Sequence, residues 1–113
     1  DSLAGYWDGS EEFVDIVNDV TDLNRENRIV IEAPLLDMSK AEIIEEGIRL
    51  GVKFKDTWTC YSDREDGLAD ATTPSSSMRV KGFIDAGYED PIVYLQQDKI
   101  NKLYSKNNCK ICA

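Results

Sequence analysis

The residues of this sequence best suited to chemistry are its thiols and its clustered carboxylates. There are three cysteines and no histidine. Cys60 stands just before an acidic stretch, and Cys109 and Cys112 form a Cys-x-x-Cys pair near the C-terminus. A structural zinc ion takes four ligands from Cys, His and carboxylate side chains. With no histidine available, the residues alone favour a half-buried Cys60 beside Trp58 and a mobile tail with free thiols.

Two other ion sites stay open on the residues alone. The tail pair would complete a three-thiolate site if it folded back onto Cys60. The loop 62–73 would offer a hard cation such as magnesium the carboxylates of Asp63, Glu65, Asp66 and Asp70. Because runs of charge are more often solvated than metal-binding, the sequence favours a solvated loop here.

Two helices that could position these groups carry clear start signals. Ser10 is followed by two glutamates, and a cap residue followed by acids is typical of a helix start. Ser39 and Glu42 have the spacing of a capping box, which predicts a helix over residues 40–50. Gly51 then suits the position just after the helix end.

The second half of the sequence predicts a further helix and a shorter one. Pro74 is typical of a first helical turn, and Gly87 can end the helix that Pro74 begins. Gly82 inside this helix would allow a neighbour to pack closely. A short helix is predicted over residues 98–105.

The sequence contains one clear strand signal. Residues 28–33 are rich in β-branched side chains, and Pro34 stops the run. A single strand cannot form a stable sheet, so it must pair with strands that this sequence does not obviously contain. The pattern therefore predicts half of an α/β domain.

Composition and charge narrow the class of protein. The chain has 113 residues, enough for one small domain, and 42% of them are hydrophobic. Its net charge of -9 argues against direct nucleic-acid binding, which needs clustered Lys and Arg. No apolar run approaches a membrane span of about 20 residues, so no membrane partner is expected. An odd number of cysteines argues against a disulfide framework and favours a cytoplasmic location.

Six segments, in the same order, resemble those of the 7-cyano-7-deazaguanine synthase family. They are residues 4–8 (Ala-Gly-Tyr-Trp-Asp), 33–43 (Ala-Pro-Leu-Leu-Asp-Met-Ser-Lys-Ala-Glu-Ile), 50–52 (Leu-Gly-Val), 58–61 (Trp-Thr-Cys-Tyr), 79–83 (Arg-Val-Lys-Gly-Phe) and 86–91 (Ala-Gly-Tyr-Glu-Asp-Pro). Any one of these motifs is weak evidence, but six in register are specific. The resemblance covers residues 1–91, and residues 92–113 form a helical and mobile tail outside it.

The resemblance implies a PP-loop ATP pyrophosphatase fold, an α/β domain with a twisted parallel sheet. Enzymes of this family use ATP and ammonia to convert 7-carboxy-7-deazaguanine into 7-cyano-7-deazaguanine, a precursor of queuosine and archaeosine. Their Ser-Gly-Gly-x-Asp-Ser loop cradles pyrophosphate, and no Ser-Gly-Gly occurs in this sequence. The chain is therefore expected to match the C-terminal, mostly helical part of the domain, with the PP-loop half as its missing partner.

The same resemblance implies several ligand-binding residues. Lys40 matches a segment whose lysine reaches ATP phosphates in PP-loop relatives, and Asp37 lies in the turn before it. Arg79 and Lys81 would face an anionic ligand, and Asp8 would bind an amine of the deazapurine substrate. The alternatives are plain ones: solvated lysines and arginine on helix faces, and turn or cap carboxylates.

The resemblance also implies a zinc site that this sequence has mostly lost. In the family, four cysteines form a zinc knuckle that ends at the Arg-x-Lys-Gly-Phe helix. Cys60 keeps the first ligand position, while Asp70, Thr73 and Ser76 stand at the other three. Asp70 is a candidate ligand beside Cys60, but hydroxyls are poor ligands for structural zinc.

Two functions from different classes remain open at this stage. The first is part of an ATP-dependent ligase that binds ATP and a small deazapurine. The second is a non-catalytic remnant of the fold that acts as a partner-binding or dimerisation module, which the lost ligands favour. The sequence leaves open whether the complete protein is a homodimer.

Overall fold

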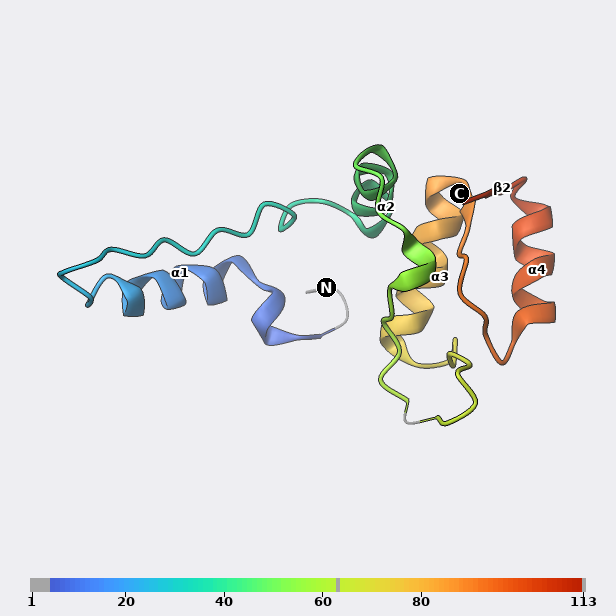
Figure 1. Cartoon of the computed structure of the whole chain (residues 1–113), viewed down its shortest axis with the longest axis horizontal. Helices are drawn as coiled ribbons and strands as arrows, with labels where there is room; N and C mark the ends of the chain where they lie inside the picture. The colour runs from blue at the N-terminus through green and yellow to red at the C-terminus, as the bar shows by residue number, and fades with distance from the viewer. Residues whose placement is uncertain (1–4, 63, 113) are drawn as a thin grey trace. The chain divides into compact units, whose positions relative to one another are not determined.

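The structure is a computed structural model that describes residues 5–62 and 64–112 (Figure 1). Ala4, in the first of the six similar segments, and Asp63, in the acidic loop, lie outside the described residues. The chain divides into two compact units at the bond between Asp37 and Met38. Each unit is described by itself.

The first unit contains the 3-10 helix η2 (Trp7–Gly9) and the helix α1 (Glu11–Thr21). The predicted cap is confirmed, because the Ser10 hydroxyl accepts a hydrogen bond from the Phe13 amide at 3.1 Å. The same hydroxyl donates to the Trp7 carbonyl at 2.9 Å. The Trp7 and Phe13 rings pack edge to face, with centroids 5.2 Å apart. These contacts fix the start of α1.

The strand predicted over residues 28–33 does not form, and this prediction is wrong for the described structure. Among the described residues no strand pairs with this segment, so its backbone lacks the regular hydrogen bonds of a sheet. At Ile31, the Asn18 side chain forms the two backbone hydrogen bonds that a neighbouring strand would form. It accepts from the Ile31 amide at 2.8 Å and donates to the Ile31 carbonyl at 3.0 Å. Ile29 and Val30 remain more than half exposed.

The second unit is mainly helical and contains a small parallel sheet. Its elements are α2 (Lys40–Arg49), η3 (Phe54–Asp56), α3 (Pro74–Ala86), β1 (Tyr88–Glu89), α4 (Gln97–Lys106) and β2 (Lys110–Ile111). β1 and β2 pair in parallel, and α3 contacts both α2 and α4 (Figure 1). Within the described ranges, no helix has the length and apolar character needed to cross a membrane.

The predicted helices of the second unit are confirmed by their local contacts. The capping box at α2 is complete, because the Ser39 hydroxyl accepts from the Glu42 amide and the Glu42 carboxylate accepts from the Ser39 amide. Gly51 and Gly87 follow their helices with positive φ angles of 78° and 82°. The short C-terminal helix also forms, as α4.

A single hydrophobic cluster joins the loops of the second unit to α3 and α4. Its buried members are Cys60, Ala69, Val80, Ile92, Tyr94, Ile100 and Tyr104. Phe83 is fully buried on α3, whereas Trp58 is 52% exposed. The Trp58 indole instead donates to the Cys60 carbonyl at 2.8 Å.

A buried ion pair between Arg79 and Asp90 contacts two members of this cluster, Tyr94 and Tyr104. Arg79 is 5% exposed, and its guanidinium donates to both Asp90 oxygens, at 2.6 and 2.9 Å. The Tyr94 hydroxyl also donates to Asp90 at 2.6 Å, and the Tyr104 hydroxyl accepts from the Asp90 amide at 3.1 Å. The pair therefore connects α3 to Tyr94, which precedes α4, and to Tyr104, which lies within α4.

The same guanidinium holds the segment that follows η3. It donates to the Phe54 carbonyl at 3.2 Å, to the Thr57 hydroxyl at 2.9 Å and to the Thr59 hydroxyl at 3.2 Å. Arg79 thereby fixes the backbone that leads directly to Cys60.

The helices α2 and α3 approach most closely at Gly82. A methyl group placed on Gly82 would lie 3.0 Å from the Lys40 Cβ and 3.1 Å from the Ile44 Cδ1, and would collide with the Lys40 Cγ. The predicted close packing at Gly82 is confirmed. It presses the aliphatic stem of Lys40 against α3.

Replacing Gly82 by alanine should destabilise the chain by about 1–3 kcal/mol, because α2 must move away from α3. This cost exceeds the gain in helix propensity of about 1 kcal/mol. Urea unfolding followed by circular dichroism measures the change. Ser77→Ala, at an exposed position on the same helix, is the control and should change little. A Gly82→Ala chain as stable as the wild type would contradict the close packing.

Candidate functional site

The four predicted knuckle positions come together around the sulfur of Cys60. The Asp70 amide donates to this sulfur at 3.4 Å, and the Thr73 hydroxyl lies 4.0 Å from it. Ser76 is buried at the start of α3 and influences the thiol. A further residue, Ser62, places its hydroxyl 2.8 Å from the sulfur. The local fold of a knuckle is therefore present, with hydroxyl and backbone groups around one thiol.

The Asp70 carboxylate accepts hydrogen bonds from a neighbour in the loop and from Gln96, the residue just before α4. Its Oδ1 accepts from the Thr72 hydroxyl at 2.7 Å, from the Thr72 amide at 2.9 Å and from the Gln96 side chain at 3.1 Å. The hydrogen bonds from Thr72 come first among the causes that hold the pKa of Asp70 below its usual value. Only the backbone of Asp70 bonds to the Cys60 sulfur.

The Cys60 thiol has an unusual environment for a buried cysteine. Burial acts to raise its pKa, but hydrogen bonds from the Ser62 hydroxyl and the Asp70 amide outweigh burial and lower the pKa to about 6. The nearby Ser76 hydroxyl acts in the same direction. The Ser76 oxygen is itself buried and has no partner with ordinary hydrogen-bond geometry.

The cationic residues predicted to bind nucleotide occupy three different environments. Lys40 begins α2 and is partly buried; this burial, and then the charge of Arg79, lowers the pKa of its amine. Arg79 is committed to the buried pair with Asp90. Lys81 is exposed on α3 and pairs with Asp85 at 2.5 Å. Lys40 and Arg79 are thus close enough to interact, while Lys81 faces solvent.

The two remaining predicted residues belong to the first unit. Asp8 lies in η2, and Asp37 ends the unit; both carboxylates are exposed. The structure therefore groups Lys40, Arg79, Cys60 and Asp70 in one unit, and Asp8 and Asp37 in the other.

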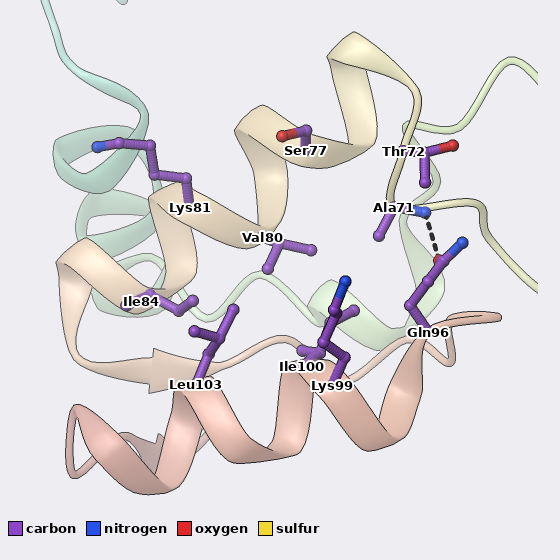
Figure 2. Close-up of a pocket in the computed structure, with 10 residues that line it drawn as sticks. All are labelled: Ala71, Thr72, Ser77, Val80, Lys81, Ile84, Gln96, Lys99, Ile100 and Leu103. Carbon is purple, nitrogen blue, oxygen red and sulfur yellow. Dashed lines mark hydrogen bonds between the residues drawn. The ribbon is translucent and has the colours of Figure 1, made fainter.

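A cavity of about 370 Å³ lies between α3 and α4 (Figure 2). Its floor is apolar, and its lining residues are Ala71, Thr72, Ser77, Val80, Lys81, Ile84, Gln96, Lys99, Ile100 and Leu103. Its volume is within the range of small-molecule sites. Lys81 is the one predicted nucleotide-binding residue in the lining, and Figure 2 shows its side chain extending away from the apolar floor. The cavity does not gather the predicted ATP-binding residues.

Comparison with known proteins identifies the family of this chain. The family model described as "Queuosine biosynthesis protein QueC" matches residues 1–87. The chain belongs to the QueC family. A curated "7-cyano-7-deazaguanine synthase" from Geobacter sp. (strain M21) is 38% identical over 96 residues, covering 80% of this chain and 43% of the relative. The synthase from Thermoplasma volcanium is 32% identical over 112 residues, covering 96% of this chain and 44% of the relative.

A third relative, the synthase from Geotalea daltonii, is 46% identical over 72 residues, which cover 64% of this chain and 31% of the relative. The chain therefore spans less than half the length of these curated relatives. No solved structure matches the chain. The family implies a PP-loop α/β fold, and the mostly helical structure with its small parallel sheet is consistent with that class.

Membership of the QueC family implies use of ATP and of zinc, and the residues here do not fit a family-type zinc site. Around the Cys60 sulfur stand hydroxyl groups and a backbone amide, where structural zinc takes thiolates, imidazoles or carboxylates. Across residues 5–62 and 64–112, no three Cys, Asp or Glu side chains gather closely enough to hold a metal ion. No chemistry is therefore assigned to zinc in this chain.

The tail cysteines lie apart from this centre. Cys109 packs against the edge of the hydrophobic cluster, and Cys112 follows β2. Burial raises the pKa of both thiols. The three-thiolate site with Cys60 does not form among the residues that the structure describes.

Three residues that shape this region were not identified from the sequence. Ser62 was assigned only to a solvated loop, Asp90 only to the similar segment 86–91, and Gln96 to no role. Asp90 stands eleven positions after Arg79, on the far side of the helix end at Gly87. The position of Asp90, next to a proline and soon after the helix that carries Arg79, was a signal of an ion pair. The sequence spacing alone did not show that the two side chains pair.

Replacing Gln96 by alanine should loosen the loop 64–73 and lower stability by about 1–2 kcal/mol, because the Ala71 amide loses its acceptor. The Gln96 side chain accepts from this amide at 3.0 Å while it donates to Asp70. Hydrogen exchange should show faster exchange at Ala71 than in the wild type. Lys99→Ala, one turn along α4 and exposed, is the control. Equal protection of the Ala71 amide from hydrogen exchange in the variant and the wild type would contradict this role of Gln96.

Proposed function

We propose that this chain is the C-terminal part of a 7-cyano-7-deazaguanine synthase, within a PP-loop domain. The complete enzyme is an ATP-dependent ligase that converts 7-carboxy-7-deazaguanine and ammonia into 7-cyano-7-deazaguanine. ATP activates the carboxylate by adenylation, and ammonia then supplies the nitrogen of the nitrile. The partners of the complete enzyme are ATP, the deazapurine and the PP-loop half.

The observation that carries this proposal is the match to curated synthases over most of this chain. The Geobacter and Thermoplasma relatives align with 80% and 96% of it. The relatives named here are all 7-cyano-7-deazaguanine synthases. They do not favour the alternative of a non-catalytic binding or dimerisation module.

Lys40 is the strongest candidate for contact with ATP. Its stem is held against Gly82, so the ammonium leaves the start of α2 in a restricted direction. A flexible ammonium at a helix N-terminus suits a polyphosphate, because the amides and the macrodipole also favour negative charge there. Asp37 and Lys81 are proposed to assist in nucleotide binding, and Asp8 in substrate binding.

Arg79 has a different proposed role from the one the motif suggested. Its hydrogen bonds go to Asp90 and to the segment before Cys60. We expect it to position Lys40 and the neighbouring backbone, while its charge lowers the pKa of the Lys40 amine.

The exposed residues 28–33 are proposed to join the central sheet of the complete domain. Their backbone makes no ladder hydrogen bonds: Ile31 bonds to the Asn18 side chain, and the Ala33 carbonyl accepts from the Leu36 amide at 3.1 Å. Their β-branched side chains are exposed, as a strand is before its sheet forms. The PP-loop half would supply the neighbouring strands.

Replacing Lys40 by methionine in the complete enzyme should lower kcat/KM for ATP by about 100-fold, because the ammonium near the phosphates is lost. Methionine keeps the apolar stem that packs on Gly82, so the fold is retained. The assay joins this chain to a PP-loop half in one polypeptide. It measures the nitrile product by mass spectrometry and the ATP-dependent release of pyrophosphate.

Lys102→Met, an exposed charge change on α4, is the matched control and should keep full activity. Failure of the joined enzyme to form the nitrile would contradict the proposed reaction. Full activity of the Lys40→Met enzyme would contradict the role of Lys40 and leave the reaction standing.

A further inference from the structure

The Cys60 sulfur is the meeting point of two segments that are distant in sequence. It lies at the end of the segment that Arg79 holds, and it receives the Asp70 amide from the loop before α3. The Ser62 hydroxyl also contacts it, at 2.8 Å. Cys60 is 7% exposed, so these contacts are shielded from water.

The distances around the sulfur resemble the spacing of ligands in a metal knuckle. A tetrahedral zinc ion with bonds of about 2.3 Å holds its sulfur ligands about 3.8 Å apart. The Thr73 hydroxyl lies 4.0 Å from the Cys60 sulfur. That hydroxyl, however, donates to the Asp70 carbonyl at 3.0 Å. At two of the ligand positions, Asp70 and Thr73, the side chains bond to other groups of the protein.

Ser76 supplies a second and independent sign of a former ligand position. It is 1% exposed, and its hydroxyl has no hydrogen-bond partner of ordinary geometry. An unpaired buried hydroxyl is costly and needs an explanation. It is explained if position 76 faces the centre of a knuckle that once held a larger ligand set.

We propose that the knuckle of this chain closes without a metal ion, around the Cys60 sulfur as a hydrogen-bonded centre. The Asp70 amide takes the place of the ion in tying residues 57–62 to the loop that leads into α3, and the Ser62 hydroxyl bonds to the same sulfur from within the segment. Two sets of hydrogen bonds anchor the two sides of the knuckle. Gln96 bonds to Asp70 and Ala71 on one side, and Arg79 bonds to Thr57 and Thr59 on the other. The chain therefore differs from four-cysteine relatives in folding independently of zinc.

The first test is the metal content and chelator response of the purified chain, expressed with added zinc. Elemental analysis should give well under about 0.2 zinc per chain, and EDTA should leave the thermal unfolding midpoint unchanged. Near one zinc per chain, with a lower midpoint after chelation, would overturn the proposal. These readouts do not depend on the proposed enzymatic function.

A pair of substitutions at Cys60 tests whether the sulfur is the centre. Cys60→Ala removes the acceptor for the Asp70 amide and should lower the unfolding midpoint by several degrees. Cys60→Ser keeps a smaller acceptor and should lose less. Cys112→Ala, outside the knuckle, is the matched control and should change little. An unchanged midpoint in Cys60→Ala would overturn the proposal.

Restoring the ligands tests whether the positions still form a tetrahedron. The triple variant Asp70→Cys, Thr73→Cys, Ser76→Cys should bind about one zinc per chain and become sensitive to EDTA. With cobalt it should show the absorption of a tetrahedral thiolate site. A folded triple variant that binds no metal would contradict the proposed geometry. If this variant does not fold, the metal content of the wild type and the Cys60 pair still decide the question.

Discussion

The buried ion pair between Arg79 and Asp90 is the interaction on which the second unit depends. The two side chains are 6% and 0% exposed, and a charged pair removed from water is stable only when its hydrogen bonds are satisfied. Here the carboxylate also accepts from Tyr94, and the guanidinium reaches Phe54, Thr57 and Thr59. Losing either partner would leave an uncompensated buried charge, whose cost is several times that of an ordinary hydrogen bond.

The pair also fixes the state of the tyrosines around it. Burial, together with the charge of Asp90, raises the pKa of Tyr94 above its ordinary value. Burial raises the pKa of Tyr104 to about 12. Both phenols therefore stay protonated at neutral pH, so Tyr94 remains a hydrogen-bond donor to Asp90. The neutral phenols add no further negative charge beside the carboxylate.

Both candidate functional features depend on this pair. Arg79 holds the backbone that carries Cys60 into the knuckle, and its charge lowers the pKa of Lys40 at the start of α2. A family in which zinc ties the knuckle to α3 has a second means of holding the same segment. In this chain the hydrogen bonds of Arg79, Gln96 and the Cys60 sulfur perform that task within the protein.

The parts of the fold that could be predicted from the sequence are those set by local chemistry. The capping box of Ser39 and Glu42 and the helix end at Gly87 depend on residues within one turn of each other. The strand at residues 28–33 failed because its partners are not local, and a β-branched run alone cannot supply them. Burial was the other weak point, since Cys60 was expected to be half-buried and is only 7% exposed.

The candidate site shows the same division. The motif placed Cys60, Asp70, Thr73 and Ser76 in one knuckle, and the structure brings them together. It did not reveal that the Asp70 backbone, rather than its carboxylate, meets the sulfur. Arg79 was predicted either to face a ligand or to be solvated, and its burial depends on Asp90, a partner across a helix end. Such partners are fixed by tertiary packing, which spacing does not encode.

A double-mutant cycle on Arg79 and Asp90 tests the central claim most directly. It compares the free energies of unfolding of the wild type, Arg79→Met, Asp90→Leu and the double variant in urea. If the pair organises the unit, the two changes should be strongly non-additive, with a coupling energy of about 2 kcal/mol or more. Effects that add to within about 0.5 kcal/mol would show that the two residues act independently, and would contradict this account.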